Sequence, residues 1–439
     1  MNIILIAAEC FPFAKSSGLG DLVFSLAKGI EKEGHNVKVF MPRYGSIDPS
    51  TFYIERLPVD FKVRFNNSNV QTMVFKGILP NSFVSVFFIE SQSHFGNSKE
   101  IYLTKEEESQ ERNKFFSLAA LEVILKLKLA PDVIHLFNSG TAHIANLLRS
   151  KNIEYINLNK AGLIFTIHGL QDFSGDFIRY TKDAIKLSDI TTTASKTYAH
   201  ELLSDIQNSI LSGIDEDLYN PEIDSGIAQV YSKNYFSIGK KKCKEDLLEL
   251  CGLEKNNSPL FGMVSRLTEE RGIDILIDSL SILANLNLQL VILGKGEESY
   301  EQELVQACSK YKNIKVFCAF DHALSKKIYA GSDFFLHPSQ YESSGTSILI
   351  AMKYGSIPVA HGTPATKEII IDIVLEEANG IIFKNYTKED LLEAISKART
   401  YYKNKEKWPR IVKSAMSFDF ASINAAKRYL DCYESIVTA

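Results

Sequence analysis

Two segments of this chain carry cations in patterns that suit a phosphorylated ligand. Residues 15–21 read Lys-Ser-Ser-Gly-Leu-Gly-Asp, between an apolar run and the apolar spacing of a helix. The glycines let the backbone approach a ligand, the helix start supplies amide groups, and Lys15 adds a point charge, which together suit a phosphate or a sugar that bears one. The alternative is packing chemistry, because a glycine turn between a first strand and a first helix is common.

The second segment, residues 265–272, reads Ser-Arg-Leu-Thr-Glu-Glu-Arg-Gly and follows an apolar run. Guanidinium groups at Arg266 and Arg271 can reach one diphosphate, and each offers paired donors that a lysine cannot match. Two solvated surface charges are the alternative, and the segment alone gives both interpretations equal weight.

One carboxylate, Glu342, stands out in residues 334–364, which read as strand, turn, helix and strand. Ser343 and Ser344 are candidate helix caps, and Gly355 is expected to end the helix. In a doubly wound sheet this order puts Glu342 at the carboxyl edge of the strands, where such folds bind ligands. A solvated loop glutamate is the alternative.

These residues need a scaffold, and the chain predicts open, mostly parallel α/β sheets to supply it. Apolar runs typical of buried strands lie at 2–8, 36–41, 87–89, 132–136, 162–167, 190–194, 260–264, 288–293, 313–317, 334–336 and 380–383. Loops after such strands are where ligands bind, which singles out His168 and Phe320. His168 is either a ligand or a hydrogen-bonded structural residue, and Phe320 either stacks on a base or belongs to the core.

Composition limits the class of protein. A chain of 439 residues is long enough for two or three domains, and a net charge of -4 gives no reason to expect a nucleic acid or an anionic membrane as partner. The six cysteines are scattered without a close pair, which points to a reducing compartment. The start, Met-Asn-Ile-Ile-Leu-Ile-Ala-Ala, lacks the features of a signal peptide, so a cytoplasmic location is expected.

Several longer motifs follow one another in a recognisable order. They are AAECFPFAKSSGLGDL (7–22), GHNVKVFMPRYG (34–45), FFSLAALE (115–122), FTIH (165–168), TTTASKTYAHEL (191–202), GIDEDLYNP (213–221), PLFGMVSRLTEERGIDIL (259–276) and IYAGSDFFLHPSQYESSGTSILIAMKYGSIPV (328–359). With these motifs the chain resembles glycogen and starch synthases over nearly its full length. That family consists of retaining glucosyltransferases with two facing Rossmann-like domains and a ligand cleft between them, the arrangement called GT-B.

The resemblance implies roles for residues that match the family's motifs. It implies four catalytic residues. His168 is expected beside the donor glucose, and Arg266 and Arg271 are expected to bind the diphosphate. Glu342 is expected to bind the glucose hydroxyls. It also implies residues that bind the donor and its phosphates. The lysine and glycine loop supplies Lys15, Gly18, Gly20 and Asp21, and Phe320 is expected to stack on adenine. Gly345 and Thr363, in turns after strands of the second half, complete this set. It implies no metal and no cofactor besides the nucleotide sugar.

The implied reaction is transfer of glucose from ADP-glucose to the 4-hydroxyl end of an α-1,4-glucan, with retention at the anomeric carbon. The expected domains are residues 1–212 on the acceptor side, 213–417 on the donor side, and a C-terminal helix at 418–439 that returns to the first domain. The expected partners are the donor and an α-glucan, with no nucleic acid and no membrane span.

Departures from the family pattern keep two alternatives open. The chain has Phe-Asn-Ser-Gly-Thr at 137–141, where the family has His-Asp-Trp-His-Thr, and Arg271 stands in place of a lysine. One alternative is a glycosyltransferase with another donor or acceptor. The other is a catalytically degenerate relative that binds glucan or nucleotide.

Overall fold

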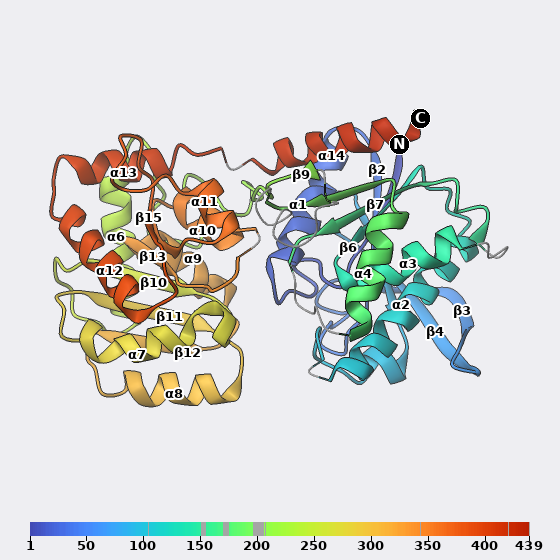
Figure 1. Cartoon of the computed structure of the whole chain (residues 1–439), viewed down its shortest axis with the longest axis horizontal. Helices are drawn as coiled ribbons and strands as arrows, with labels where there is room; N and C mark the ends of the chain where they lie inside the picture. The colour runs from blue at the N-terminus through green and yellow to red at the C-terminus, as the bar shows by residue number, and fades with distance from the viewer. Residues whose placement is uncertain are drawn as a thin grey trace. The chain divides into compact units, whose positions relative to one another are not determined.

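The computed structural model describes residues 1–103, 105–150, 155–169, 175–195, 206, 208–342, 344–419 and 421–438. The chain divides into two compact units, of which unit 1 comprises Met1–Gly213 and Ala421–Ala439 and unit 2 comprises Ile214–Phe420 (Figure 1). Each unit is a sheet covered by helices, so the α/β class with two mostly parallel sheets, predicted from the sequence, is confirmed.

Unit 1 contains a nine-stranded sheet in the order β3-β4-β5-β2-β1-β6-β7-β8-β9. Its strands are β1 (Asn2–Ile6), β2 (Asn36–Pro42), β3 (Glu55–Phe65), β4 (Ser68–Ile78), β5 (Ser85–Glu90), β6 (Val133–Phe137), β7 (Gly162–Ile167), β8 (Ile190–Thr193) and β9 (Asn208–Ser209). Neighbours from β5 through β9 pair in parallel, whereas β3, β4 and β5 pair antiparallel. β1, β6 and β7 are buried almost throughout, as their continuous apolar sequences require.

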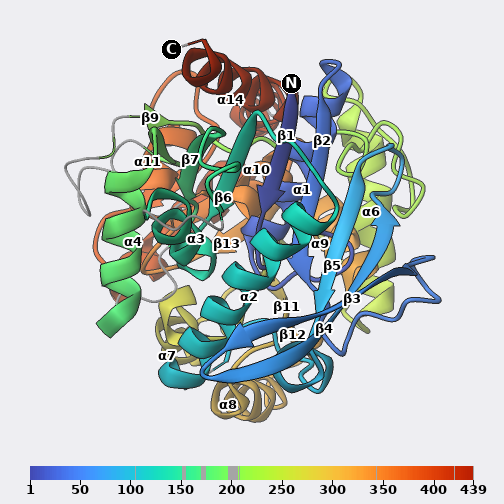
Figure 2. The ribbon, with the colours of Figure 1, turned by 90° about the vertical axis from the view of Figure 1, so that its right-hand side faces the viewer.

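The helices of unit 1 cover this sheet. They are α1 (Gly18–Lys32), the short π-helix η1 (Gln92–Gly96), α2 (Glu106–Lys126), α3 (Ser139–Arg149), α4 (Gly175–Leu187) and α14 (Ser422–Val437). Figure 2 shows α2 in front of the sheet beside α3, which it contacts. α1 begins at Gly18, so the glycines expected in the turn before this helix form its first turn instead.

The C-terminal helix α14 packs on α1 and β7 of unit 1. Two glycines make room for it: a Cβ atom on Gly29 would lie 2.6 Å from Ala426 Cβ, and one on Gly162 would lie 2.6 Å from Ile436 Cγ2. A buried hydrogen bond of 2.8 Å between the Tyr433 hydroxyl and His135 Nδ1 adds a polar contact to this packing. The last helix is therefore part of the first unit's core although unit 2 separates them in the sequence.

The sequence prediction missed the antiparallel hairpin of β3 and β4 in unit 1, and it also missed the two-residue strand β9. Phe65 pairs with Ser68, so the loop has only two residues, Asn66 and Asn67, both with positive φ (46° and 60°). Positive φ at both loop residues is the conformation of tight hairpin turns, and asparagine adopts it more readily than most residues. Burial alternates along the last part of β3, which shows that the hairpin covers the core with one face only.

Unit 2 contains a six-stranded, all-parallel sheet in the order β12-β11-β10-β13-β14-β15. Its strands are β10 (Leu260–Val264), β11 (Gln289–Gly294), β12 (Ile314–Cys318), β13 (Phe334–His337), β14 (Ile357–His361) and β15 (Ile381–Phe383). Its helices are α6 (Phe236–Leu250), the 3-10 turn η3 (Glu269–Arg271), α7 (Ile273–Leu283), α8 (Glu298–Cys308), α9 (His322–Gly331), α10 (Thr346–Lys353), α11 (Pro364–Ile369), α12 (Lys388–Tyr402) and α13 (Lys407–Ala415).

Both sheets reverse their strand order at one point, and this decides where ligands can bind. In unit 2 the reversal lies between β10 and β13, and in unit 1 it lies between β1 and β6. At such a point the loops after the two central strands diverge to opposite faces and leave a crevice at the carboxyl edge. The loops after β10 and β13 contain Arg266, Arg271 and Glu342, so the topology itself brings these residues together.

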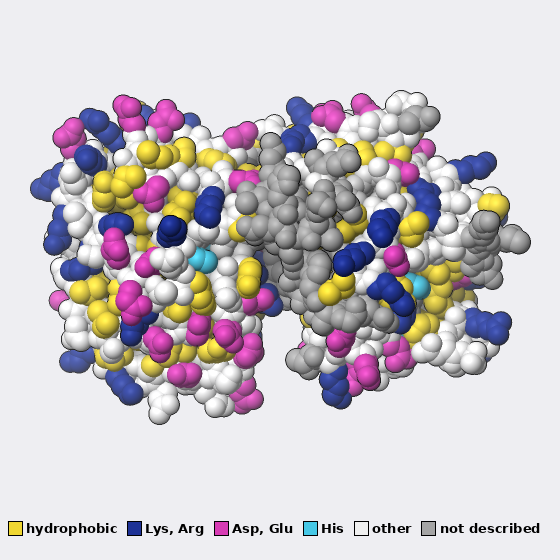
Figure 3. Space-filling model, in the orientation of Figure 1, with side chains coloured by type: hydrophobic (Ala, Val, Ile, Leu, Met, Phe, Trp, Pro, Cys, Tyr) yellow, Lys and Arg dark blue, Asp and Glu magenta, His cyan; other side chains and the backbone are white. Residues whose placement is uncertain are grey.

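The described part of the face drawn in Figure 3 carries charges of both signs. Figure 3 shows basic and acidic side chains interspersed on the face that it draws, consistent with the small net charge of -4. Among the described residues, every helix is too short or too polar to cross a membrane.

Candidate functional site

Glu342 is held in the turn between β13 and α10 of unit 2. Its Oε1 accepts hydrogen bonds from the backbone N–H groups of Ser344 and Gly345, both at 3.0 Å. Its Oε2 lies 2.9 Å from Arg271 Nη1 and 3.0 Å from His337 Nε2. The side chain is only 9% exposed, so Glu342 is not a solvated loop residue.

The surroundings of Glu342 keep it ionised. Burial alone would raise the pKa of its carboxyl, but the Arg271 guanidinium, His337 and the Gly345 N–H outweigh burial and hold the pKa well below its usual value. The site therefore contains a fixed negative charge beside a fixed positive one.

The expected helix caps in this turn are not found. α10 begins at Thr346, and its N-cap is Gly345 in the left-handed conformation (φ 66°), without a side-chain cap. Ser344 was predicted as a cap, but its N–H and its hydroxyl (3.3 Å) both turn to Glu342 Oε1; Ser343 lies outside the described residues. The prediction that Gly355 ends this helix is confirmed, since α10 stops at Lys353 and Gly355 has a φ of 67°.

The two arginines after β10 share a second carboxylate. Arg266 Nη2 contacts Glu270 Oε1 closely, and the same oxygen lies 3.7 Å from Arg271 Nε. The turn reaches the loop after β13 through the Gln340 N–H, which donates to the Glu270 carbonyl at 2.9 Å. Gly272 permits this approach, because a Cβ at its φ of 78° would lie 2.3 Å from the Pro338 carbonyl oxygen.

Two further predicted donor residues of unit 2 occupy different surroundings. Phe320 follows β12 and is 68% exposed, so it does not belong to the core and its ring is available for stacking. Thr363 is buried and is the N-cap residue of α11, with its hydroxyl 3.1 Å from that of Thr366. Pro364 occupies the first turn of α11 and offers no backbone N–H.

In unit 1 the loop between β1 and α1 is organised by Glu9, which is fully buried. Its carboxylate accepts from the backbone N–H groups of Ser16 (2.6 Å) and Ser17 (2.8 Å), from the Ser17 hydroxyl (2.7 Å) and from the Tyr102 hydroxyl (2.5 Å). The two amide groups just before the helix, which the sequence suggested for a ligand, are therefore taken by a protein carboxylate.

Lys15 and Asp21, both predicted as donor-binding residues, form an ion pair with an Nζ to Oδ2 distance of 2.5 Å. Asp21 lies in the first turn of α1 and is buried, and its other oxygen, Oδ1, has no hydrogen-bond partner among the described residues. An ionised oxygen buried in this way is unfavourable unless a donor reaches it. A hydrogen-bond donor from a ligand can reach this buried oxygen only if the loop opens around it.

His168 lies at the carboxyl end of β7 and is buried. Its backbone N–H donates to Asn138 Oδ1 at 2.7 Å, and its Nδ1 lies 3.5 Å from the Ser212 hydroxyl. Asn138, which follows β6, adopts a positive φ of 57°, so its side chain ties together the ends of two neighbouring strands. The strand order of unit 1 positions His168 next to the turn that departs most from the family pattern.

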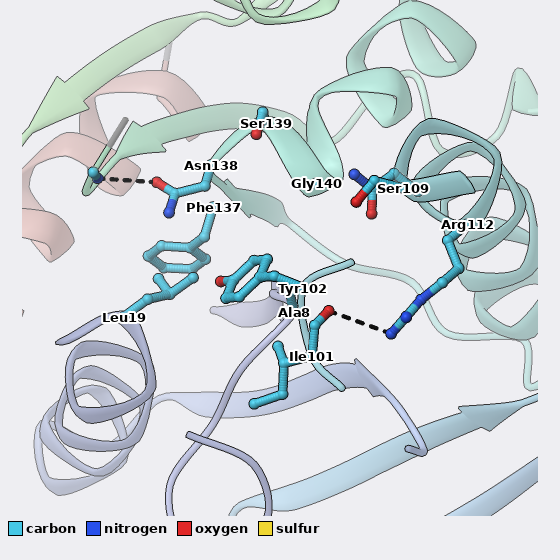
Figure 4. A pocket seen from close by; sticks show the side chains of 12 residues that line it. Ala8, Leu19, Ile101, Tyr102, Ser109, Arg112, Phe137, Asn138, Ser139 and Gly140 are labelled. Atoms are coloured by element: carbon cyan, nitrogen blue, oxygen red, sulfur yellow. Dashed lines mark hydrogen bonds between the residues drawn. The ribbon is translucent and has the colours of Figure 1, made fainter. Parts of the chain in front are cut away.

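A pocket opens beside this turn, within unit 1 (Figure 4). Figure 4 shows Arg112 reaching in from α2, while Phe137 and Asn138 come from the end of β6. The remaining lining residues are Ala8, Leu19, Ile101, Tyr102, Ser109, Asn113, Ser139, Gly140 and Gly169. Its volume of about 20 Å³ admits one or two water-sized groups.

Four residues of these networks were not singled out from the sequence: Glu9, Tyr102, Glu270 and His337. The signal available for Glu270 was its place between the two arginines. Nothing local marked Tyr102, which is 93 residues from its partner Glu9. In the part of the chain that the structure describes, no group of three or more His, Cys, Asp or Glu side chains is arranged to hold a metal ion.

Comparison with known proteins identifies the family. Residues 2–218 match the starch synthase catalytic domain, and residues 252–414 match the glycosyl transferases group 1 domain. The glycogen synthase of Geotalea daltonii is 32% identical over 483 aligned residues, which cover 100% of this chain and 99% of that protein. The chain belongs to the glycogen and starch synthase family. It is a glycosyltransferase of the glycogen synthase type.

Further relatives agree with this assignment. The glycogen synthase of Thermotoga maritima is 31% identical, covering 99% of this chain and 98% of that protein. The catalytic domain of starch synthase IV from Arabidopsis thaliana, solved with ADP and acarbose bound, matches with a TM-score of 0.89 and 28% identity over 100% of this chain and 99% of that one. WaaG, a glycosyltransferase involved in lipopolysaccharide biosynthesis, matches with a TM-score of 0.61 and 14% identity, covering 98% of this chain and 99% of that one, which shows the fold alone. The GT-B fold expected for the family is thereby confirmed.

Proposed function

We propose that this family member transfers glucose from ADP-glucose to the 4-hydroxyl end of an α-1,4-glucan, with retention at the anomeric carbon. The observation that carries the proposal is the meeting of Arg266, Arg271 and Glu342 at the reversal point of the unit 2 sheet. Adenosine diphosphate is supported as the leaving group by the starch synthase IV structure, which contains ADP.

The arginines act on the departing diphosphate. Loss of the sugar leaves negative charge on the diphosphate oxygens, and a guanidinium placed in advance stabilises that charge without reorganisation. Arg271 is fixed by Glu342 and is 21% exposed, while Arg266 is 29% exposed. Both can therefore meet a ligand from solvent, and Phe320 supplies an exposed ring on which adenine can stack.

Glu342 is the residue that we assign to the glucose hydroxyls. Its ionised state lets it accept hydrogen bonds from a sugar, and its rigid turn fixes where those bonds point. Gly345 and Thr363 complete the turns after β13 and β14 on the same edge of the sheet.

Unit 1 contributes groups suited to the sugar and the acceptor. We assign Lys15, Gly18, Gly20 and Asp21 to the donor phosphates and sugar, because Lys15, in the loop before α1, pairs with Asp21 in the first turn of this helix, where Asp21 Oδ1 has no hydrogen-bond partner among the described residues. We assign His168 to the donor glucose, and the pocket beside Asn138 to the acceptor.

The location that we propose is the cytoplasm. All six cysteines carry free thiols, as is usual in a reducing compartment, where disulfides are rare. The proposed reaction uses the nucleotide sugar as substrate and needs no further cofactor.

The proposal is tested by Arg266→Ala. Removal of one donor that stabilises developing charge typically lowers the rate by a factor of about 100 to 1,000, so we expect release of ADP from ADP-glucose in the presence of glycogen to fall by that factor. Arg410→Ala is the matched control, because Arg410 is 77% exposed and pairs only with Glu406 among the described residues. Turnover by Arg266→Ala equal to that of the control would refute the assignment.

A second candidate function, transfer between another donor and acceptor, is favoured by the pocket lined by Phe137, Asn138, Ser139 and Gly140. Those four residues stand where the resemblance predicts an acid and two imidazoles. A panel of nucleotide sugars, each assayed with and without glycogen, separates the candidates. Release of the nucleoside diphosphate from another donor, or without stimulation by glycogen, would favour the second function, and no release from any donor would favour a binding protein.

A further inference from the structure

Charged side chains of opposite sign alternate in the loops that follow β10 and β13 in unit 2. Arg266 contacts Glu270, Glu270 lies beside Arg271, and Arg271 contacts Glu342. Two guanidinium groups thus face two carboxylates, and the local formal charge of these four residues is zero. A diphosphate that contacts these four side chains meets no net positive charge from them as long as both carboxylates stay in place.

The two carboxylates differ in how firmly they are held. Glu342 is 9% exposed and accepts two backbone N–H groups in addition to Arg271 and His337. The Glu270 side chain is 40% exposed, and in the described part of the chain its carboxylate contacts only the two arginines. Glu270 can therefore turn toward solvent by side-chain rotation, whereas Glu342 cannot leave without breaking its turn.

The backbone of Glu270 stays fixed when its side chain moves. Its carbonyl oxygen accepts the Gln340 N–H at 2.9 Å, and the next residues, Arg271 and Gly272, complete the 3-10 turn through hydrogen bonds to Thr268 and Glu269. Rotation of the Glu270 side chain thus leaves the backbone of the turn in place, and Arg271 keeps its contact with Glu342. It also frees the Nη2 group of Arg266 and the Nε group of Arg271.

We infer that Glu270 is an internal competitor of the donor diphosphate: its carboxylate contacts both arginines and must be displaced when a nucleoside diphosphate binds. This inference rests on the proposed donor site. Glu270 would lower the affinity for both the donor and the ADP product. Release of the product is thereby favoured, and binding of the donor is weakened. A given N–H group of a guanidinium donates its charge-assisted hydrogen bond either to a carboxylate or to a phosphate oxygen, so the two anions compete for the same donor.

The experiment measures by calorimetry how ADP binds to the whole chain and to its variants Glu270→Gln, Glu269→Gln and Arg266→Ala. Glu270→Gln keeps the size of the side chain and removes its charge, and we expect the Kd for ADP to fall by about three- to tenfold. Glu269→Gln is the matched control, because Glu269 lies in the same turn but its side chain is exposed, and we expect its Kd to stay within about twofold of wild type. The gain for AMP, which has one phosphate group fewer, should be smaller than the gain for ADP.

Two outcomes would overturn the inference, and they are distinguishable. If Arg266→Ala weakens ADP binding while Glu270→Gln leaves it unchanged or weaker, the donor site stands and Glu270 positions the arginines instead of competing. If Arg266→Ala leaves the Kd for ADP unchanged, the donor site itself is wrong and the inference fails with it.

Discussion

Replacing Glu342 with glutamine should destabilise unit 2, because the four groups nearest to this carboxylate, at 2.9 to 3.0 Å, belong to Arg271, His337, Ser344 and Gly345 and all serve as hydrogen-bond donors. A glutamine has one acceptor oxygen and one NH₂ group. If its NH₂ group faces Arg271, two donors meet there; if it faces Ser344 and Gly345, it meets two backbone N–H groups. Neither orientation satisfies all partners of the native carboxylate.

The magnitude follows from the contacts that are lost. Breaking a buried charged pair by removing one partner costs about 3 to 5 kcal/mol, and the partial exposure of Arg271 (21%) puts the expectation at the lower end, about 3 kcal/mol. For a unit of about 200 residues this corresponds to a melting temperature lower by about 6–12 °C. The assay is a thermal melt at pH 7, with Glu269→Gln as the control that removes one exposed charge nearby.

The pH dependence gives an independent check on the same residue. The folded-state pKa of Glu342 is held well below its ordinary value of 4.5, so its contribution to stability is present above the unfolded-state pKa and is lost as the pH falls through the folded-state pKa. The difference between wild type and Glu342→Gln should be constant from pH 7 to about 5 and should shrink below about pH 4.5. A melting temperature equal to that of Glu269→Gln, or a difference that does not change with pH, would refute the described network.

Two further predictions concern the core and the nucleotide. Burial lowers the pKa of His135 to about 3, so below about pH 6.5 this residue takes up a proton in the unfolded chain but not in the folded one. The free energy of unfolding therefore decreases by about 1.4 kcal/mol for each unit by which the pH is lowered in that window. His135→Gln should remove this contribution, so that the stability of the variant falls less steeply from pH 6.5 to 5, while His94 and His143, whose pKa values are also lowered by burial, keep theirs. Parallel stability profiles for the two proteins would contradict it. Phe320→Ala should weaken ADP binding by about 1–3 kcal/mol, the usual value of base stacking on an aromatic ring, and should leave the melting temperature unchanged because the ring is 68% exposed. Phe83→Ala, which removes a ring that is 91% exposed in unit 1, is the calorimetric control, and an equal Kd in the two variants would count against stacking.

Most strands were predictable because they are buried on both faces. Continuous apolar runs such as Gly162–Ile167 and Leu260–Val264 coincide with β7 and β10, since a parallel strand covered by helices needs apolar side chains on either side. The hairpin β3–β4 was missed because only one of its faces is buried, so its pattern alternates and carries polar residues. The pair Asn66-Asn67 was the local signal that could have revealed it.

The helix starts were less predictable than the strands. α1 begins at Gly18 and α10 at Thr346, and in both cases the preceding backbone N–H groups bind a carboxylate, Glu9 or Glu342. α1 also has a serine cap, because the Ser17 hydroxyl accepts from the Leu19 N–H at 3.2 Å, whereas α10 has no side-chain cap. The usual cap pattern of adjacent serine and threonine residues does not predict a carboxylate that reaches along the loop. The loops' own geometry decided which side chain took that place.

The sequence by itself determined the residue types of the candidate site and the order of the elements that contain them. Arg266, Arg271, Glu342, His168 and Lys15 were all found from local patterns, because a cation, a glycine or a lone acid after an apolar run can be recognised without distant residues. The order of strands and helices was likewise sufficient for the fold class, since parallel strands need helical crossovers.

Only the tertiary structure decided how those residues are paired. That Glu342 meets Arg271 depends on β13 lying beside β10, although the two residues are 71 positions apart. That Glu9 meets Tyr102, 93 residues away, depends on segments that the sheet of unit 1 brings together. Glu270, in contrast, lies in the same loop as both arginines, and its contacts with them are local in the sequence. Ion pairing acts over a few ångströms in space and takes no account of distance along the chain, so the charge balance of the site appears only when the chain is folded.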